Sequence, residues 1–226
     1  MDSMKRVPTR ELLDTDSGTP DEVAASLADL RRINRWFGGV ATTMAMVRSV
    51  ATETRRSSFS LLEVAAGSGY VPQIAQRELA RDGVHIEITL LDQLRSHLNG
   101  NSRGVVGNAL ALPFRDNCFD LVNCGLFAHH LGPEEVIQFV NEGLRVCRVA
   151  VLINDLIRHP LHMALVYAGY PLYRSRLTRH DAPASVRQSY TVAEMEEILR
   201  QTRASRVQIS RHYLFRMGAI AWSPDG

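Results

Sequence analysis

A short turn of small residues between a strand-like run and a helical run constrains this chain more than any other feature. Residues 59–64 have the length and apolar character of a buried strand, residues 65–69 read Ala-Ala-Gly-Ser-Gly, and residues 71–81 have helical periodicity. Small residues at such a turn let backbone N–H groups approach a ligand at the start of the helix. The segment therefore predicts the site of a nucleotide-like cofactor, with a turn that serves close packing alone as the alternative.

Strands and helices alternate along the rest of the chain. We expect further strands at residues 85–91, 105–106, 119–124 and 148–153, a helix at 133–145, a second capped helix from Thr191 to about residue 201, and a closing strand pair at 207–215 and 219–222. Strands separated by helices predict a parallel sheet with right-handed crossovers. The fold class is therefore α/β.

The N-terminal region divides into two parts. Residues 1–18 are polar and without period, so we expect a flexible tail. Thr19, Pro20 and Glu22 form a helix-starting capping box, and Gly38-Gly39 supplies a stop before a second helix at about 40–55. We therefore expect N-terminal helices at 19–56 and a main domain at 57–226, with an insertion at about 156–190 folding over the site as a lid.

Composition excludes several kinds of function. Lys5 is the only lysine and lies in the expected tail, which excludes a buried Schiff-base lysine and a phosphate-binding loop of the Walker A type. The three cysteines form no C-x-x-C pair, so we expect neither disulfides nor a metal. With a net charge of +2 and scattered arginines, a nucleic-acid partner is not expected. No signal peptide or spanning segment is evident, which predicts a cytoplasmic protein of undetermined oligomeric state.

Polar residues also follow the next two strands. Asp92 comes directly after the apolar run 86–91, where a carboxylate can accept hydrogen bonds from both hydroxyls of a ribose. A solvated aspartate at a helix start is the alternative. Asn108 and the backbone amide of Ala109 precede the strand at 119–124, where they could bind the edge of an adenine.

These residues resemble the class I S-adenosylmethionine-dependent methyltransferases of the small-molecule type. The family's acid, spacer and glycine-rich turn are similar to residues 63–69, its ribose-binding acid to Asp92, its adenine-binding dipeptide to Asn108-Ala109, and two further motifs to residues 107–131. The resemblance implies a doubly wound, Rossmann-like sheet of seven mostly parallel strands, with helices on both faces and an N-terminal helical lid. It makes residues 57–226 the methyltransferase catalytic domain.

The resemblance also implies S-adenosyl-L-methionine as the cofactor and S-adenosyl-L-homocysteine as its product. The residues expected to bind the cofactor are Glu63, Ala65, Gly67, Gly69, Asp92, Gln93, Asn108, Ala109, Leu110 and Cys124. Two of them depart from the family pattern, since Ala65 replaces a common glycine and Asn108 a common aspartate. A methyl group at Ala65 fits if that residue keeps a negative φ, and the Asn108 side-chain oxygen can accept the same hydrogen bond if its amide is oriented correctly. A dinucleotide site is disfavoured because Pro72 stands where the third glycine of G-x-G-x-x-G belongs.

Candidate catalytic residues follow the fourth and fifth strands. Methyl transfer to a hydroxyl needs a base near neutral pH, and histidine suits that role. His130 is the preferred base, with His129 beside it and Asp155 as an orienting group or a base itself. The alternatives are histidines that cap a helix or pack the sheet rim, and an aspartate that satisfies a turn.

The acceptor is expected to be a small molecule. By analogy with the family, it is methylated on an oxygen of a phenolic, quinone or polyketide-like compound. Asn34, Arg35, Trp36 and Phe37 in the first helix, and Arg179, His180 and Arg187 in the lid, are candidate contacts, and residues 163–170 a candidate core helix. The rival hypothesis is a catalytically inactive methyltransferase-like module that binds a protein partner.

Overall fold

Seven strands form one sheet in the computed structural model, which describes residues 4–15, 17–98 and 104–224. The strand order is β3-β2-β1-β4-β5-β7-β6, with only β7 antiparallel to its neighbours. The strands are β1 Ser58–Val64, β2 His85–Asp92, β3 Gly104–Val106, β4 Phe119–Gly125, β5 Cys147–Leu156, β6 Arg206–His212 and β7 Arg216–Trp222. The expected doubly wound, seven-stranded, mostly parallel sheet is confirmed.

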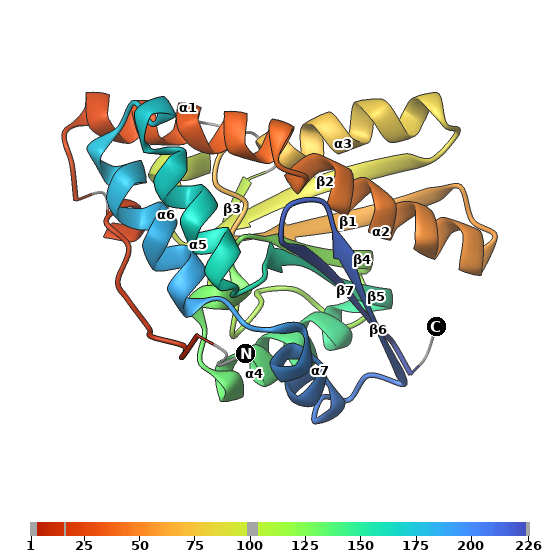
Figure 1. The fold of residues 1–226 in the computed structure, drawn as a ribbon. Helices are drawn as coiled ribbons and strands as arrows, with labels where there is room; N and C mark the ends of the chain where they lie inside the picture. Colours follow the sequence, from red (N-terminus) through yellow and green to blue (C-terminus); the bar gives the residue numbers. More distant parts are fainter. Residues whose placement is uncertain (1–3, 16, 99–103, 225–226) are drawn as a thin grey trace.

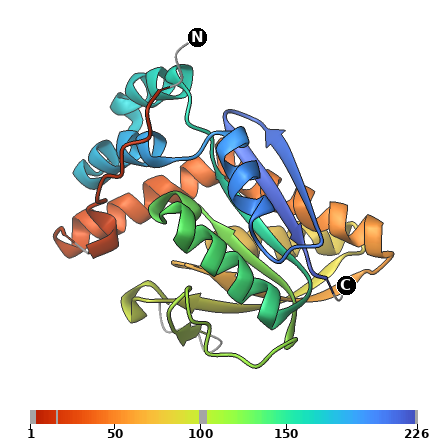
Figure 2. The same ribbon diagram turned by 90° about the horizontal axis from the view of Figure 1, so that it is seen from below.

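Helices cover both faces of this sheet (Figures 1 and 2). One face carries α1 Pro20–Trp36, α2 Gly39–Thr54 and α3 Tyr70–Arg81, and the other carries α4 Pro133–Val146 and α7 Val192–Arg200. Chain order reverses between β1, which continues to β2 and β3, and β4, which continues to β5. In an open α/β sheet the crevice at the carboxyl ends of such strands is where ligands bind.

Two apolar layers hold the helices to the sheet. One contains Phe139 and Val140 of α4 with Leu62 and Val122 of the sheet, and the other contains Met46 of α2 with residues on the opposite side of the same strands. Each fully buried leucine or phenylalanine side chain contributes about 1.5–3 kcal/mol through the hydrophobic effect. The two layers therefore keep the strand ends rigid, and side chains placed there hold fixed positions.

The capping boxes predicted from the sequence are present. Thr19 accepts a hydrogen bond from the backbone of Glu22 and the Glu22 carboxylate accepts one in return, and Thr191 and Glu194 repeat the arrangement at α7. Gly38 has φ +82°, a left-handed conformation that links α1 to α2. The closing strand pair is interrupted where the sequence suggested a continuous strand, because residues 213–215 form the turn between β6 and β7.

Residues 4–15, expected to be part of a flexible tail, pack against the body of the protein. The Arg6 guanidinium donates hydrogen bonds to the backbone oxygens of Gln188, His129 and Leu131. The Asp181 carboxylate accepts hydrogen bonds from the backbone N–H groups of Leu12 and Leu13. These partners are more than 100 residues away in sequence, which is why local periodicity gave no sign of them.

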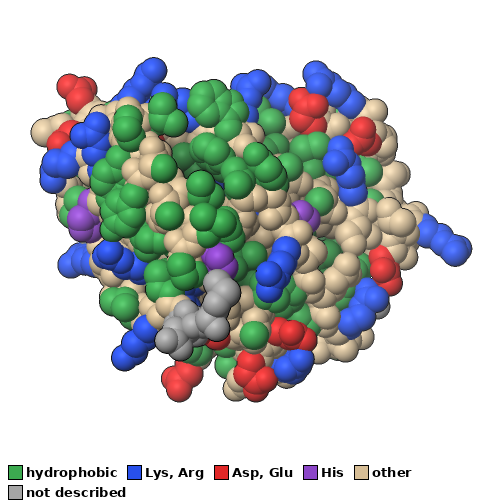
Figure 3. Space-filling view, viewed as in Figure 1, with side chains coloured by type: hydrophobic (Ala, Val, Ile, Leu, Met, Phe, Trp, Pro, Cys, Tyr) green, Lys and Arg blue, Asp and Glu red, His purple; other side chains and the backbone are tan. Residues whose placement is uncertain are grey.

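The insertion at residues 156–190, which we expected to fold over the site as a lid, forms two helices beside α1. They are α5 Pro160–Ala168 and α6 Arg176–Gln188. The expectation of a core helix at 163–170 is wrong, because Val166 is the only buried residue of α5 while Leu161 and Leu165 are 55% and 43% exposed. Figure 3 shows apolar side chains gathered on this face. Within the described residues, no helix is long and apolar enough to cross a membrane.

Candidate functional site

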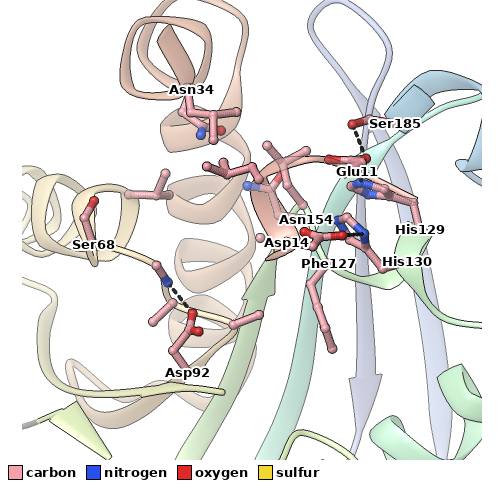
Figure 4. A pocket seen from close by; sticks show the side chains of 18 of the residues that line it. Glu11, Asp14, Asn34, Ser68, Asp92, Phe127, His129, His130, Asn154 and Ser185 are labelled. Carbon is pink, nitrogen blue, oxygen red and sulfur yellow. Dashed lines mark hydrogen bonds and ion pairs between the residues drawn. The ribbon is translucent and has the colours of Figure 1, made fainter. Parts of the chain in front are cut away.

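A cavity of about 520 Å³ lies at the carboxyl ends of β1, β2, β4 and β5. It is covered by α1, α5, α6 and the N-terminal segment, here defined as residues 4–15. The close-up places Asp92 and Ser68 on one side and the two histidines with Glu11 on the other (Figure 4). The cavity therefore has two halves, a glycine-turn half and a histidine half.

Asp92 organises the glycine-turn half. One carboxylate oxygen accepts a hydrogen bond from the backbone N of Gly67 at 2.8 Å, and the other accepts one from the backbone N of Leu94 at 2.9 Å. Gly67 has φ +52°, and a Cβ placed on it would meet no atom within 4 Å, so its backbone faces open space. A carboxylate oxygen can accept more than one hydrogen bond, so a carboxylate held in this way can also accept from a ligand hydroxyl.

Gly69 has a different role from the one expected. It does not line the cavity but forms the left-handed N-cap of α3, with φ +69°. A Cβ at this position would lie 2.6 Å from Leu90 Cδ1, so the glycine permits close packing of helix against strand. Gly69 therefore serves close packing, the alternative given above for this turn, whereas Gly67 faces the cavity as expected for a ligand-binding turn.

Ala65 lines the cavity with φ +53°, so the condition under which a methyl group fits there without strain, a negative φ, is not met. A left-handed conformation costs a residue with a Cβ roughly 1–2 kcal/mol, which explains why glycine suits this position. The backbone is held there because Ala66 N donates to Leu91 O at 3.0 Å and Gly69 N donates to Ala66 O at 2.8 Å. The turn thus keeps the shape of a glycine turn in spite of the alanine.

Glu63 presents a buried carboxyl at the floor of the cavity. Burial raises its pKa to about 8, against the smaller opposing effect of a hydrogen bond from the Asn123 side-chain amide at 2.7 Å. Within the described residues, Asn123 is the hydrogen-bond partner of this carboxyl. A cation bound in the cavity would restore its charge, so the floor suits a positively charged ligand.

Four more of the residues expected to bind the cofactor line this half, namely Gln93, Asn108, Ala109 and Leu110. The Asn108 side-chain oxygen accepts a hydrogen bond from Leu110 N at 2.9 Å, which orients the amide. Cys124 does not line the cavity, because it is fully buried in the core beside β1. Its position directly before the cavity-lining Gly125 explains why sequence spacing suggested a contact.

His129 lies between two carboxylates in the histidine half. Its Nδ1 lies 2.6 Å from Asp155 Oδ1, its backbone N donates to Asp155 Oδ2, and its Nε2 lies 3.4 Å from Glu11 Oε1. Burial alone would lower the pKa of His129, but Asp155 and Glu11 outweigh it and raise the pKa to about 10. At neutral pH the His129 ring is therefore protonated on both nitrogens, and Asp155 is buried behind it.

His130 is paired with an exposed carboxylate, that of Asp14, whereas the carboxylates beside His129 are buried. The Nδ1 of His130 lies 3.0 Å from a carboxylate oxygen of Asp14, and its ring lies 4.2 Å from that of His129 between centroids, tilted by 33°. The ring borders the cavity and is partly accessible. If the neutral ring has its proton on Nδ1 and donates a hydrogen bond from it to Asp14, then Nε2 is a hydrogen-bond acceptor. His130 can then accept a proton from a ligand, while His129 cannot.

Glu11, His129 and His130 also place one potential ligand atom each within 4.8 Å of one another. This spacing would admit a metal ion. The proton on His129, however, already balances one of the two carboxylates that flank it.

Comparison with known proteins identifies this arrangement. The profile of a family described as "Methyltransferase domain" matches residues 62–152, from within β1 to within β5. Residues 62–152 of the chain are therefore similar to a methyltransferase domain. A search of curated proteins found no match to the chain.

Solved structures of methyltransferases share the fold of this chain. The plantazolicin methyltransferase BpumL, solved with a monoazolic desmethylPZN analog and SAH, is 13% identical, covers 94% of each chain and has a TM-score of 0.68. A SAM-dependent methyltransferase from Aquifex aeolicus is 16% identical over 78% of this chain and 88% of its own, with a TM-score of 0.53. Magnesium protoporphyrin IX methyltransferase from Synechocystis, with bound SAH, is 13% identical over 82% and 83%, with a TM-score of 0.52.

The cavity brings together most, but not all, of the residues that the sequence suggested. Asn34 lines the cavity, whereas the other first-helix and lid candidates do not: Arg35, Trp36, Phe37, Arg179, His180 and Arg187. These six side chains are exposed. Residues 156–190, the expected lid, contribute small and apolar residues to the cavity instead, among them Ala182, Ser185 and Val186.

Sequence reasoning missed four charged groups in the cavity wall: Glu11, Asp14, Arg31 and Arg216. Glu11 accepts hydrogen bonds from Ser185 Oγ at 2.6 Å and Gln188 Nε2 at 2.7 Å. The run Glu11-Leu12-Leu13-Asp14 offered a weak signal, because two adjacent apolar residues stand between two acids in an otherwise polar segment. Arg216 begins a strand that reads as apolar, so nothing local marked it as facing a ligand.

Proposed function

We propose that the protein transfers a methyl group from S-adenosylmethionine to an oxygen of a small phenolic, quinone or polyketide-like acceptor. The observation that carries this proposal is one cavity that joins Asp92 and the glycine turn to a histidine pair. Methyl transfer requires both halves, because the electrophile and the nucleophile must be aligned in one site. The expected cytoplasmic location accords with this chemistry and remains a prediction.

The glycine-turn half fits an adenosine bearing a positive charge. Asp92 would accept the ribose hydroxyls, Asn108 and the backbone of Ala109 would bind the adenine, and Gly67 would let the ligand approach the turn. Glu63 supplies the negative charge that a cationic ligand needs at the floor. The cofactor itself would supply a methyl group on a sulfonium centre.

The histidine half provides a base of suitable chemistry. His130 would accept the acceptor's hydroxyl proton at Nε2 while Asp14 holds Nδ1. His129, kept protonated by Asp155 and Glu11, would fix the position of its neighbour rather than remove a proton. These roles divide the three proposed catalytic residues into one base, His130, and two positioning residues, His129 and Asp155.

The walls between the halves favour a flat apolar acceptor. Leu27, Leu30 and Ile33 of α1 face the cavity from one side, and Phe127 and Val166 from others. Apolar and aromatic walls with a few convergent polar groups are typical of sites for small organic molecules. An aromatic ring with a hydroxyl group satisfies both requirements.

The test is methyl transfer from labelled S-adenosylmethionine to a panel of phenols and hydroxyquinones. His130→Ala should lower kcat about 100-fold or more while leaving the affinity for S-adenosylhomocysteine unchanged, because a general base contributes on the order of 10²–10⁴ in rate. His85→Ala, an exposed histidine at the opposite end of the sheet, is the matched control. Undiminished turnover in His130→Ala would refute the assigned base.

A panel that yields no methylated product at all would favour the rival hypothesis of an inactive binding module. In that case a stable complex with a protein partner should appear on pull-down. Transfer to even one acceptor excludes that rival as the sole function.

A further inference from the structure

Arg216 is a buried charge without a charged partner. The residue is 1% exposed, at the start of β7, and lines the cavity. Its hydrogen bonds go to neutral oxygens: Phe37 O at 3.3 Å, Asn154 Oδ1 at 3.4 Å and Asn34 Oδ1 at 3.0 Å. Within the described residues, no carboxylate lies within ion-pair distance of it. Burying an ion without a counter-charge is costly, so such a group calls for an explanation.

The surroundings of Arg216 leave its charge uncompensated. Burial lowers the pKa of the guanidinium to about 10, and the nearest acid with an effect on it, Asp155, is already paired with His129. His162, which also lines the cavity, has its pKa lowered by burial first and then by Arg216. The wall around Arg216 is therefore a positive, largely dry surface that suits an anion.

The position of Arg216 places it on the acceptor side of the cavity. The strand order β1-β4-β5-β7 puts its strand three steps from the glycine turn, a lateral distance of about 14 Å at ~4.8 Å per strand. The groups assigned to the adenosine extend in the other direction, on β1, β2 and the segment after β3. The histidine pair, which follows β4, lies between the two.

We propose that Arg216, with Asn34 and Asn154, binds a carboxylate on the methyl acceptor, so that the substrate class is a hydroxy-aromatic acid rather than a neutral phenol. A guanidinium offers two parallel N–H donors that match the two oxygens of a carboxylate. The two asparagines hold the fork through their side-chain oxygens, and Asn154 is itself fixed by donating to Gly39 O and Thr43 Oγ1 at 2.7 and 2.9 Å. This inference rests on the proposed function.

The experiment compares 2,4-dihydroxybenzoate with resorcinol, which differ by one carboxylate, by titration calorimetry in the presence of saturating S-adenosylhomocysteine. The wild-type protein should bind the acid at least tenfold more tightly. Arg216→Gln should abolish that preference and leave the affinity for resorcinol and for S-adenosylhomocysteine within about twofold. Arg216→Lys, which keeps the charge without the fork, should retain part of the preference.

Two outcomes would overturn the inference. The first is equal affinity of the wild-type protein for 2,4-dihydroxybenzoate and resorcinol. This comparison requires no variant, so it tests the inference even if Arg216→Gln does not fold. The other is a loss of S-adenosylhomocysteine affinity in Arg216→Gln, which would assign the arginine to the cofactor's own carboxylate. Arg211→Gln, an exposed arginine on the adjacent strand, is the control. Absence of S-adenosylhomocysteine binding by the wild type would instead count against the proposed function.

Discussion

Single residues carry the chemistry of this protein, and several of them do so at the expense of stability. Glu63 is buried with one amide partner, Ala65 adopts a left-handed conformation, and Arg216 is an ion without a counter-ion. Strained or poorly compensated groups that gather around one cavity are typical of a functional site. Sequence motifs identified Glu63 and Ala65, because their positions in the turn are fixed by local spacing. Arg216 could not be identified from local spacing, because the residues around it, such as Asn34 and Asn154, are distant in the sequence and come together only in the fold.

Glu63→Gln should stabilise the protein at pH 8 by about 1–3 kcal/mol and change it little at pH 5. The folded-state pKa of about 8 lies above the ordinary value of 4.5, so between these values the folded state binds more protons than the unfolded state. The free energy of unfolding of the wild type therefore falls as pH rises through that window, whereas glutamine does not titrate. Urea denaturation at the two pH values measures the difference.

Glu134→Gln, an exposed carboxylate at the start of α4, is the matched control for that measurement. The interpretation of Glu63 fails if Glu63→Gln is no more stable relative to the wild type at pH 8 than at pH 5. Because glutamine cannot supply the negative charge assigned to this position, the same variant should bind S-adenosylmethionine more weakly.

Among the elements, those with local signals were predictable and those fixed by distant contacts were not. Capping boxes marked the starts of α1 and α7, and apolar periodicity marked the strands. The N-terminal segment has neither, yet it delivers Glu11 and Asp14 to the two histidines. Its place is fixed by partners such as Asp181 and Gln188 on α6, and by Arg158, which donates to Met4 O. The prediction for α5 was wrong for the opposite reason. Its apolar run predicted a buried helix, but most of its side chains are not buried in the fold.

Arg6→Ala should release the N-terminal segment. Its guanidinium makes three hydrogen bonds to backbone oxygens and lies 4.2 Å from the Tyr190 ring centroid, so its loss should cost about 1–3 kcal/mol. Hydrogen exchange of residues 4–14 should quicken and methyl transfer should slow, while cofactor affinity holds. Lys5→Ala, at an exposed neighbouring position, should do neither. Equal exchange rates in both variants would show that Arg6 does not hold the segment.

At the scale of the whole molecule, the order of the strands explains why the sequence indicated most of the glycine-turn half, the proposed cofactor half, but only part of the histidine half, the proposed acceptor half, namely Asn34, His129 and His130. The cofactor half is built from β1, β2 and the segment after β3, which follow one another in the chain. The acceptor half gathers residues 11, 34, 130, 154, 185 and 216, which are spread over nearly the whole chain. Only the folded sheet brings these together, so acceptor specificity is a property of the assembled molecule.

The most direct measurement is the affinity of the intact protein for S-adenosylhomocysteine by titration calorimetry. The account predicts a dissociation constant on the order of micromolar, about −8 kcal/mol, and a loss of at least tenfold in Asp92→Ala. Asp82→Ala, an exposed aspartate paired with Arg48, should bind like the wild type. No measurable binding of either S-adenosylmethionine or S-adenosylhomocysteine, or binding that survives in Asp92→Ala, would contradict the account.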